Sequence, residues 1–192
     1  EEDFGFQNEK ISNVHTDNGN FECDKAIITA GIWSKELMLK LGLNIPLEAE
    51  RGYHVVYKNA SILPRNPMMM TIGKFGVTPM GSDLRCAGTV ELGGIKLGPS
   101  KAPIKLLRRR VAEAFPKMCY DKTEEWFGFR PTAPDSLPLI GQLKESGVYT
   151  AFGHQHIGMT SGPKTGRLIA DIINQRSPNI DISVYDPNRY NL

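Results

Sequence analysis

Residues 148–173 read VYTAFGHQHIGMTSGPKTGRLIADII. The apolar run at 148–152 predicts a strand, and apolar residues at helical spacing predict a helix over 164–174. The loop between them contains Gly153 and Gly158, which let a ligand approach the backbone closely. A helix that begins after such a loop presents unpaired N–H groups and a positive dipole end. The pattern therefore predicts an anion-binding loop, and an ordinary strand–helix connection is the alternative.

An arginine flanked by prolines precedes this stretch, in the segment GFRPTAPDSLPLIG at residues 128–141. Because proline restricts the backbone, the step from Arg130 to Pro131 predicts a turn that holds the arginine in place. A held guanidinium can bind a carboxylate through two parallel hydrogen bonds. We therefore expect Arg130 to bind a ligand's carboxylate, and an internal salt bridge with Asp135 is the alternative.

Periodicity predicts a mixture of strands and helices over the rest of the chain. Residues 1–30 read as a β-meander, and they include an apolar run at 26–29 that is typical of a strand buried on both faces. Residues 45–95 predict an antiparallel sheet, because short apolar runs alternate with Gly, Pro and Asp turns. The expected strands in that sheet are 53–57, 68–72, 77–80, 84–86 and 89–92. The other expected elements are helices over 34–41 and 101–115 and a strand over 126–129.

The composition indicates a soluble globular protein and argues against nucleic acid as a partner. The chain has 192 residues, of which 40% are hydrophobic and 23% are charged, and its net charge is only +2. The one basic run, Arg108-Arg109-Arg110, is expected on the solvated face of a helix, with a membrane-surface patch as the alternative.

The cysteines and the ends of the chain bear on its location. Cys23, Cys86 and Cys119 are odd in number and far apart, which argues against a disulfide framework or a metal site and fits a reducing compartment. The sequence has no run long enough to span a bilayer and no signal peptide. We expect a cytoplasmic protein, with peripheral association at the inner face of the membrane as an alternative. Because the chain starts with Glu1 rather than Met, it reads as processed, trimmed, or a piece of a longer protein.

One common motif is absent. No GxGxxG follows a strand with an acidic residue about twenty positions further on. The sequence therefore does not carry the usual first half of a dinucleotide-binding fold.

Four segments, taken together and in order, resemble one family. They are AIITAGIWS at 26–34, LRCAGTVELG at 84–93, GFRPTAPDSLPLIG at 128–141, and residues 149–168. This set is similar to the FAD-dependent D-amino acid dehydrogenases within the D-amino acid oxidase-like family of oxidoreductases, and the similarity covers nearly the whole chain.

The resemblance implies an α+β fold with two parts. An antiparallel, β-rich substrate-binding domain would occupy residues 46–127. Residues 1–45 and 128–192 would form the C-terminal remainder of a Rossmann-like FAD-binding domain, and the second of these segments would carry the substrate arginine.

The resemblance also implies roles for individual residues. Arg130 would bind the substrate carboxylate, and Tyr53 would approach the substrate pocket. Gly31 and Trp33 would lie beside the adenosine-diphosphate part of FAD. The loop beside the flavin ring would contain Gly153, His154, Gly158, Met159 and Thr160. No side chain is expected to act as the catalytic group, because the flavin carries the chemistry.

The implied reaction is hydride transfer from the Cα of a small amino-acid or amine substrate to flavin N5, after which the imino acid hydrolyses to a 2-oxo acid and ammonia. The electron acceptor, a quinone or O₂, stays open. Complete members begin with a strand, GxGxxG and a helix that hold the FAD pyrophosphate.

That N-terminal half is missing here, so a further segment or a second chain would have to supply it. We expect this chain alone to bind FAD weakly or not at all and to be inactive. Two alternatives stay open: a non-catalytic folded remnant or interaction module, and a glycine- or sarcosine-type amine oxidase.

Overall fold

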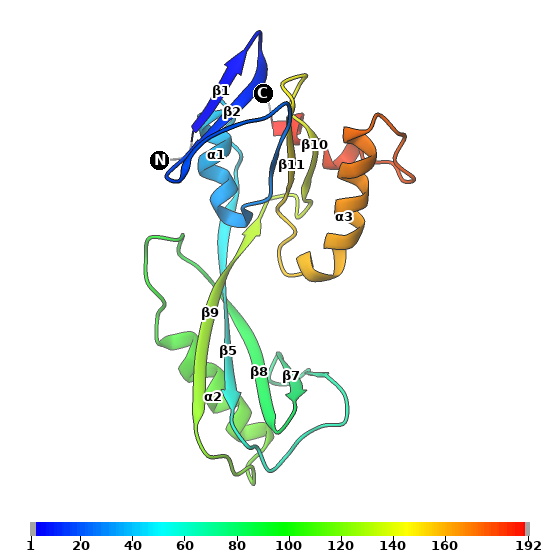
Figure 1. Cartoon of the computed structure of the whole chain (residues 1–192). Coiled ribbons are helices and arrows are strands. Elements are labelled where there is room, and N and C mark those ends of the chain that lie inside the picture. The colour runs from blue at the N-terminus through cyan, green and yellow to red at the C-terminus, as the bar shows by residue number, and fades with distance from the viewer. Residues whose placement is uncertain (1–2, 191–192) are drawn as a thin grey trace. The chain divides into compact units, whose positions relative to one another are not determined.

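The computed structural model describes residues 3–190, which fold as two units (Figure 1). The first unit contains the residues up to Glu48 and those from Arg130 onward, and the second unit contains Ala49–Phe129. The boundaries expected from the sequence, after residues 45 and 127, lie close to these divisions. Helices and strands occur in both units, which confirms the α+β class. The assignment of the two units to cofactor and to substrate stays a prediction.

The first unit opens with the expected β-meander. Strands β1 (Asp3–Gln7), β2 (Lys10–Thr16) and β3 (Gly19–Glu22) pair antiparallel in the order β1-β2-β3. Asn8 and Glu9 join β1 to β2 with φ of 50° and 64°. Two consecutive positive φ values are typical of the tight turn that matches the twist of a hairpin.

A second sheet of the first unit contains β4 (Ala26–Ile28), β10 (Leu139–Gln142) and β11 (Val148–Phe152), in the order β10-β11-β4. Strand β11 pairs antiparallel with β10 and parallel with β4. The prediction that β4 is buried on both faces is wrong for Ile27, which is 47% exposed, whereas Ile28 is buried. The reason is that β4 is the last strand in this order.

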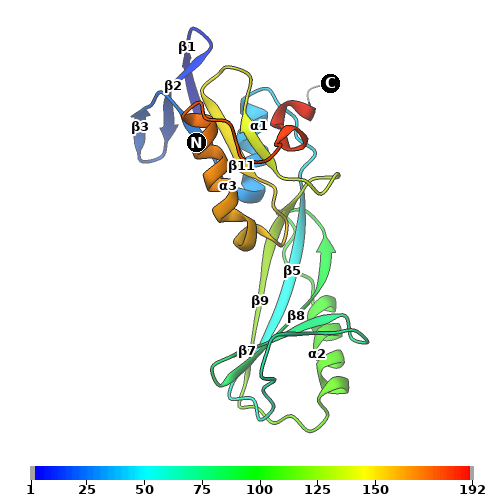
Figure 2. The same cartoon turned by 90° about the vertical axis from the view of Figure 1, so that its right-hand side faces the viewer.

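Two helices flank these strands. A short 3₁₀ turn, η1 (Gly31–Trp33), leads into α1 (Ser34–Lys40), close to the expected bounds. Helix α3 (Gly158–Ile173) lies alongside β11 (Figure 2). Its Leu168 and Ile169 form a buried cluster with Ile140 of β10 and Tyr149 of β11. The turns η2 (Ser183–Tyr185) and η3 (Pro187–Tyr190) follow α3.

Helix α3 begins six residues before the predicted start at Lys164. The segment 158–163 reads as a loop because it is rich in Gly, Ser, Thr and Pro. It is helical because the N–H groups of Thr160 and Ser161 both donate to the carbonyl of Ile157, at 3.0 and 2.9 Å. The glycine-rich loop of the sequence is thus, in its second half, the first turn of α3.

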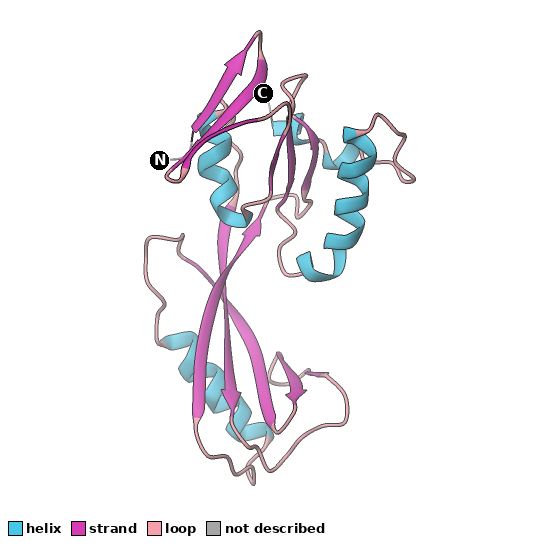
Figure 3. Ribbon diagram, in the orientation of Figure 1, coloured by secondary structure: helices cyan, strands magenta, loops and turns pink. Residues whose placement is uncertain are grey.

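The second unit is built on a five-stranded sheet in the order β6-β7-β8-β5-β9 (Figure 3). Its strands are β5 (Glu48–Tyr57), β6 (Met68–Met70), β7 (Phe75–Met80), β8 (Asp83–Leu92) and β9 (Thr123–Thr132). The pairs β6–β7, β7–β8 and β5–β8 are antiparallel, as predicted. Two strands expected at 84–86 and 89–92 form the single strand β8. The break read from the sequence is a bulge at Thr89, whose φ is 67°.

Helix α2 (Ala102–Ala114) covers one face of this sheet, as its amphipathic pattern predicts. Ile104, Leu107 and Val111 are buried against alternate residues of the strands, among them Tyr53 and Val55. On the opposite face the His54 ring stacks on Trp126, with ring centroids 4.9 Å apart. Neighbouring residues of β5 therefore face opposite sides of the sheet.

Candidate functional site

Two loops of the first unit follow the carboxyl ends of two parallel strands. Strands β4 and β11 run parallel, with Ile28 opposite Thr150. Gly31 follows the carboxyl end of β4, and Gly153 follows the carboxyl end of β11. Ligands of open α/β sheets bind outside the carboxyl ends of parallel strands. The segments in which the sequence predicts contacts to the two ends of FAD therefore lie together, at the carboxyl ends of β4 and β11.

The turn after β11 requires glycine. Gly153 has a φ of 87°, and a Cβ at this position would lie 3.4 Å from both Pro138 Cα and Leu139 Cδ1. Two residues later Gln155, with a φ of 51°, donates its backbone N–H to the carbonyl of Pro131 at 3.2 Å. This hydrogen bond holds the loop beside the end of β9 that carries Arg130. This hydrogen bond has no local signal in the sequence, because its partners are 24 positions apart.

His154 is fixed by a contact with α3. Its Nε2 lies 2.8 Å from the hydroxyl oxygen of Thr165, and Thr165 is buried. Burial lowers the pKa of His154 below the usual histidine value, because the charged imidazolium is poorly solvated there. His154 is therefore a neutral, oriented side chain at neutral pH rather than a cation. Sequence reasoning missed Thr165, since it lies eleven positions away on the next element.

The first turn of α3 is formed by Gly158, Met159 and Thr160. It has no acidic residue and no side-chain cap, and Met159 is 96% exposed. The first N–H groups of a helix have no acceptor within the helix, and the dipole adds a partial positive charge. This 16-residue helix can therefore present its N-terminus to a negatively charged group.

Arg130 lies in strand β9, so the predicted turn at Arg130-Pro131 is wrong. Extended backbone suits the residue before a proline, which explains why the strand continues through this step. The side chain is half-buried, and its guanidinium has no hydrogen bond or ion pair with any residue between 3 and 190. It is thus available to an anionic ligand.

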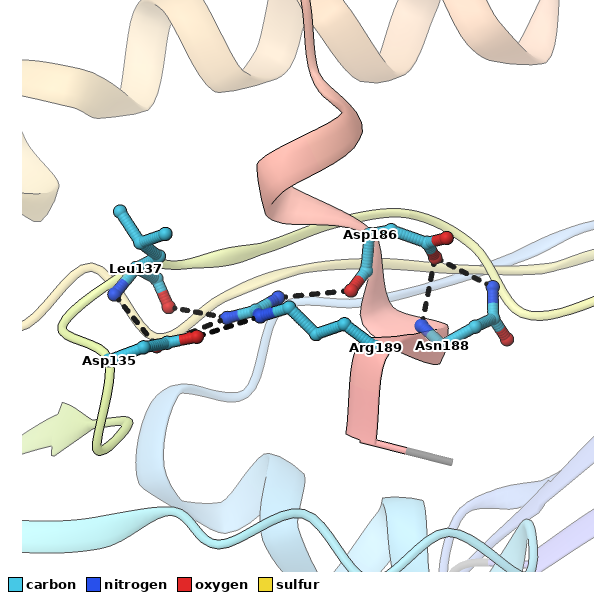
Figure 4. Close-up of polar contacts among 5 residues, drawn as sticks. All are labelled: Asp135, Leu137, Asp186, Asn188 and Arg189. Carbon is cyan, nitrogen blue, oxygen red and sulfur yellow. Dashed lines mark hydrogen bonds and ion pairs between the residues drawn. The ribbon is translucent and has the colours of Figure 1, made fainter. Parts of the chain in front are cut away.

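The alternative for Arg130, an internal salt bridge with Asp135, is also wrong. Asp135 pairs with Arg189 of η3, whose Nε lies 2.8 Å from Oδ2 of the carboxylate (Figure 4). Arg189 also donates to the carbonyl of Leu137 at 3.0 Å, and the Leu137 N–H donates to Asp135. Partial burial acts to raise the pKa of Asp135, but the hydrogen bonds from Arg189 and Leu137 hold it below its usual value. The C-terminal segment therefore holds the turn that follows β9.

A broad depression lies beside Gly31 and Trp33. Its volume is about 950 Å³, and the Trp33 side chain is 55% exposed. The lining residues are Asp17, Thr29, Ala30, Gly31, Trp33, Glu36, Leu37 and Lys40. Next to it the Ser34 hydroxyl is buried with no hydrogen-bond partner. An unpaired buried hydroxyl and an open surface with an exposed indole fit a nucleotide, although the sequence has no glycine-rich phosphate loop to complete the contact.

Tyr53 lies in the second unit with its hydroxyl fully engaged. The side chain is 3% exposed, and the hydroxyl donates to Glu91 and accepts from the N–H of Ser100 at 3.3 Å. Arg51, which is buried, donates to the same carboxylate at 2.6 Å. The ring packs on the α2 side of the sheet. The role of Tyr53 towards a substrate stays a prediction, and the Arg51–Glu91 pair was not anticipated from the sequence.

Comparison with known proteins agrees with this arrangement. The DAO family, described as FAD dependent oxidoreductase, matches residues 2–172. The chain belongs to this DAO family of FAD-dependent oxidoreductases. The resemblance read from the four sequence segments is thereby confirmed.

Relatives of this DAO family chain include both D-amino-acid and glycine enzymes. A D-amino-acid oxidase of Bradyrhizobium diazoefficiens is 38% identical over 94% of this chain and 44% of its own length. A glycine oxidase of Pseudomonas aeruginosa is 31% identical over 93% of this chain and 50% of its own length. The crystal structure of glycine oxidase from Geobacillus kaustophilus, 23% identical, has a TM-score of 0.85 and covers 97% of this chain and 51% of that one, which shows the shared fold.

The chain thus spans about half the length of the curated relatives it matches. No helix between residues 3 and 190 is long and apolar enough to cross a membrane.

Proposed function

We propose that this chain is the C-terminal part of a flavin-dependent oxidoreductase that oxidatively deaminates D-amino acids. The observation that carries the proposal is that the parallel strands β4 and β11 end side by side, with Gly31 and Gly153 following their carboxyl ends. The Gln155–Pro131 hydrogen bond adds an unpaired arginine, Arg130, beside the second of these loops. A cofactor edge with an adjacent cation suits the oxidation of a substrate that carries a carboxylate.

Each group of residues has a distinct role in this proposal. Arg130 binds the substrate carboxylate and so orients Cα. The first turn of α3, Gly158 to Thr160, places the N–H groups of Gly158 and Met159 where negative charge develops on the flavin ring, and the Thr160 N–H is already bonded to Ile157. His154, held neutral by burial and oriented by Thr165, keeps the loop in shape without adding a second cation. When bound, FAD supplies the hydride acceptor, and the imino acid released hydrolyses to a 2-oxo acid and ammonia.

The proposal requires a second half. Between residues 3 and 190 only β11 pairs with β4, so one edge of β4 is open. The open edge of a strand presents unpaired N–H and C=O groups that can pair with a further strand, which agrees with additional strands joining at β4 in the complete protein. The chain's coverage of 44% of the D-amino-acid oxidase and 50% of the glycine oxidase supports the same inference. We expect the chain alone to bind FAD weakly and not to turn over substrate.

Two other functions remain as alternatives. The identity to a glycine oxidase favours a glycine- or sarcosine-type amine oxidase as the second candidate. The absence of a glycine-rich phosphate loop favours a non-catalytic folded remnant or an interaction module as the third. The three differ in flavin content and in substrate.

Co-expression with the N-terminal half of a relative distinguishes the three candidate functions. The chain is produced with the N-terminal half of the Bradyrhizobium D-amino-acid oxidase, and the purified pair is tested for bound FAD and then for turnover. D-alanine, L-alanine and glycine are offered with a dye acceptor and separately with O₂. We expect bound FAD and release of pyruvate and ammonia from D-alanine. Glycine as the only substrate, with peroxide formed, would establish the second candidate, and a folded pair without FAD would establish the third.

A further inference from the structure

The second unit contains a pocket of about 510 Å³ between the beginning of α2 and the strands β5 and β9. All of its lining residues lie between 53 and 127, so it is formed within the second unit. This volume lies in the range of roughly 300–1,000 Å³ that holds small organic ligands. None of the residues expected to bind FAD lines it.

The floor of the pocket is apolar. Tyr53, Ile104 and Phe127 line it, and the rings of Tyr53 and Phe127 lie 6.3 Å apart at an interplanar angle of 37°. Phe127 is 37% exposed, and its ring lies edge-on to that of Phe129, with the centroids 5.9 Å apart. The Phe127 ring is therefore held in place by its neighbour and still accessible to a ligand. An aromatic or branched apolar group would gain burial there.

The rim of the pocket is cationic. Lys101 and Lys105 are exposed, and neither has an ion-pair partner among residues 3–190. Arg108, one turn further along α2, is paired with Glu125 at 2.7 Å, and Glu125 is the only acidic residue of the lining. The charge of the two lysines is thus uncompensated at the mouth of an apolar pocket.

The wall that carries Lys101 is fixed in advance. Arg51 is buried and donates to the carbonyls of Gly94, at 3.0 Å, and Leu97. The N–H of Ser100 donates to the Tyr53 hydroxyl at 3.3 Å. The segment between β8 and α2 is therefore attached to β5 at several points. A preformed wall loses little conformational entropy when a ligand binds.

We propose that this pocket binds an organic anion made of an aromatic or branched apolar body and one carboxylate. The body lies on Tyr53, Ile104 and Phe127, and the carboxylate lies between Lys101 and Lys105. This site lies within the second unit and does not depend on bound flavin; of the residues expected to bind the substrate it contains Tyr53 but not Arg130.

The test uses the complete 192-residue chain and indole-3-acetate as the probe, with neutral indole-3-acetamide as its match. Binding is measured by calorimetry and by saturation-transfer NMR, at low and high salt. We expect the acid to bind at least about tenfold more tightly than the amide, and its dissociation constant to rise with salt, because exposed charges are screened. No binding of the acid up to about 10 mM, or equal binding of acid and amide, would overturn the proposal.

Variants locate the site. The double variant Lys101→Ala and Lys105→Ala should weaken binding of the acid by about tenfold or more and leave the amide unchanged, because each lysine supplies only electrostatic attraction. Lys117→Ala, an exposed lysine outside the pocket, is the matched control. Phe127→Ala should weaken both probes, and circular dichroism checks that each variant is folded. An equal loss in Lys117→Ala, or no loss in the double variant, would contradict the assignment.

Discussion

At the scale of single residues, Arg130 is the most informative side chain. Its guanidinium is unpaired within residues 3–190, while Asp135, five positions further along the chain, is already bound to Arg189. We expect Arg130→Ala in the reconstituted enzyme to lower kcat/KM for D-alanine by roughly 100-fold, about 3 kcal/mol, because two charge-assisted hydrogen bonds are lost. Arg130→Lys should recover part of this loss.

Arg109→Ala is the control for that variant. Arg109 is exposed on α2, and its one ion pair among residues 3–190 is with Glu113, at 3.7 Å. Steady-state kinetics on the three variants checks the expectation. A kcat/KM that is unchanged in Arg130→Ala, or lowered equally in Arg109→Ala, would remove Arg130 from the substrate site.

Glu91 predicts a pH dependence of stability. Hydrogen bonds from Ser100, Tyr53 and Arg51 lower its pKa from 4.5 to about 2. A carboxyl whose pKa is lower in the folded state contributes stability that is complete above its unfolded pKa and lost as the pH falls. We therefore expect Glu91 to contribute fully above about pH 4.5 and progressively less down to about pH 2.

Thermal unfolding between these pH values measures this contribution. Glu91→Gln should lower the melting temperature at neutral pH and flatten its fall with acid. Glu113→Gln, which alters only an exposed pair on α2, should leave the acid limb unchanged. If Glu91→Gln melts with the same acid dependence as the parent chain, the buried Arg51 has another principal partner.

At the scale of elements, one glycine before α3 and one within it should respond oppositely to alanine. Gly153 has a φ of 87° and a Cβ there would meet Pro138 and Leu139 at 3.4 Å, so Gly153→Ala should cost about 1–2 kcal/mol. Gly166 is helical and exposed with no atom within 4 Å of a Cβ, so Gly166→Ala should stabilise by about 0.5–1 kcal/mol. Urea unfolding of both variants checks this, and a loss of stability in Gly166→Ala would contradict its place on an exposed helical turn.

Most elements could be predicted from local periodicity. Helix α2 has the expected bounds because Ile104, Leu107 and Val111 lie on one face. The start of α3 could not be predicted in this way. Residues 158–163 have the composition of a loop, but backbone hydrogen bonds to Ile157 hold them in a helical turn. Strand β10 was missed for another reason: its four residues are defined by pairing with β11 rather than by a pattern of their own.

The candidate site, too, could be predicted from the sequence only in part. The types of residue around Arg130 and the glycine loop could be read from the sequence, since glycine and proline act locally. The partners of those residues could not: Thr165 for His154, Arg189 for Asp135 and Pro131 for Gln155 are all distant in sequence. Specific tertiary contacts of this kind leave no short-range signal.

At the scale of the whole molecule, the second unit has a core covered by a helix, whereas, within residues 3–190, a strand of the first unit has no neighbour on one side. The second unit has a closed core in which α2 covers its sheet. In the first unit β4 ends a sheet with an open edge and an exposed Ile27. The chain matches 44% of the Bradyrhizobium D-amino-acid oxidase and 50% of the Pseudomonas glycine oxidase. The proposed function requires a larger assembly, to which this chain would contribute Arg130 and the loop from Gly153 to Thr160.

The measurement that tests this most directly is reduction of the bound flavin in the reconstituted pair without oxygen. The visible flavin absorbance is followed after D-alanine is added, with L-alanine as the matched control. We expect D-alanine to bleach the absorbance, L-alanine to leave it unchanged, and Arg130→Ala to slow the bleaching by roughly 100-fold. A pair that holds FAD but is not bleached by D-alanine, or is bleached equally by both isomers, would contradict the proposal that this chain belongs to a D-amino acid oxidoreductase.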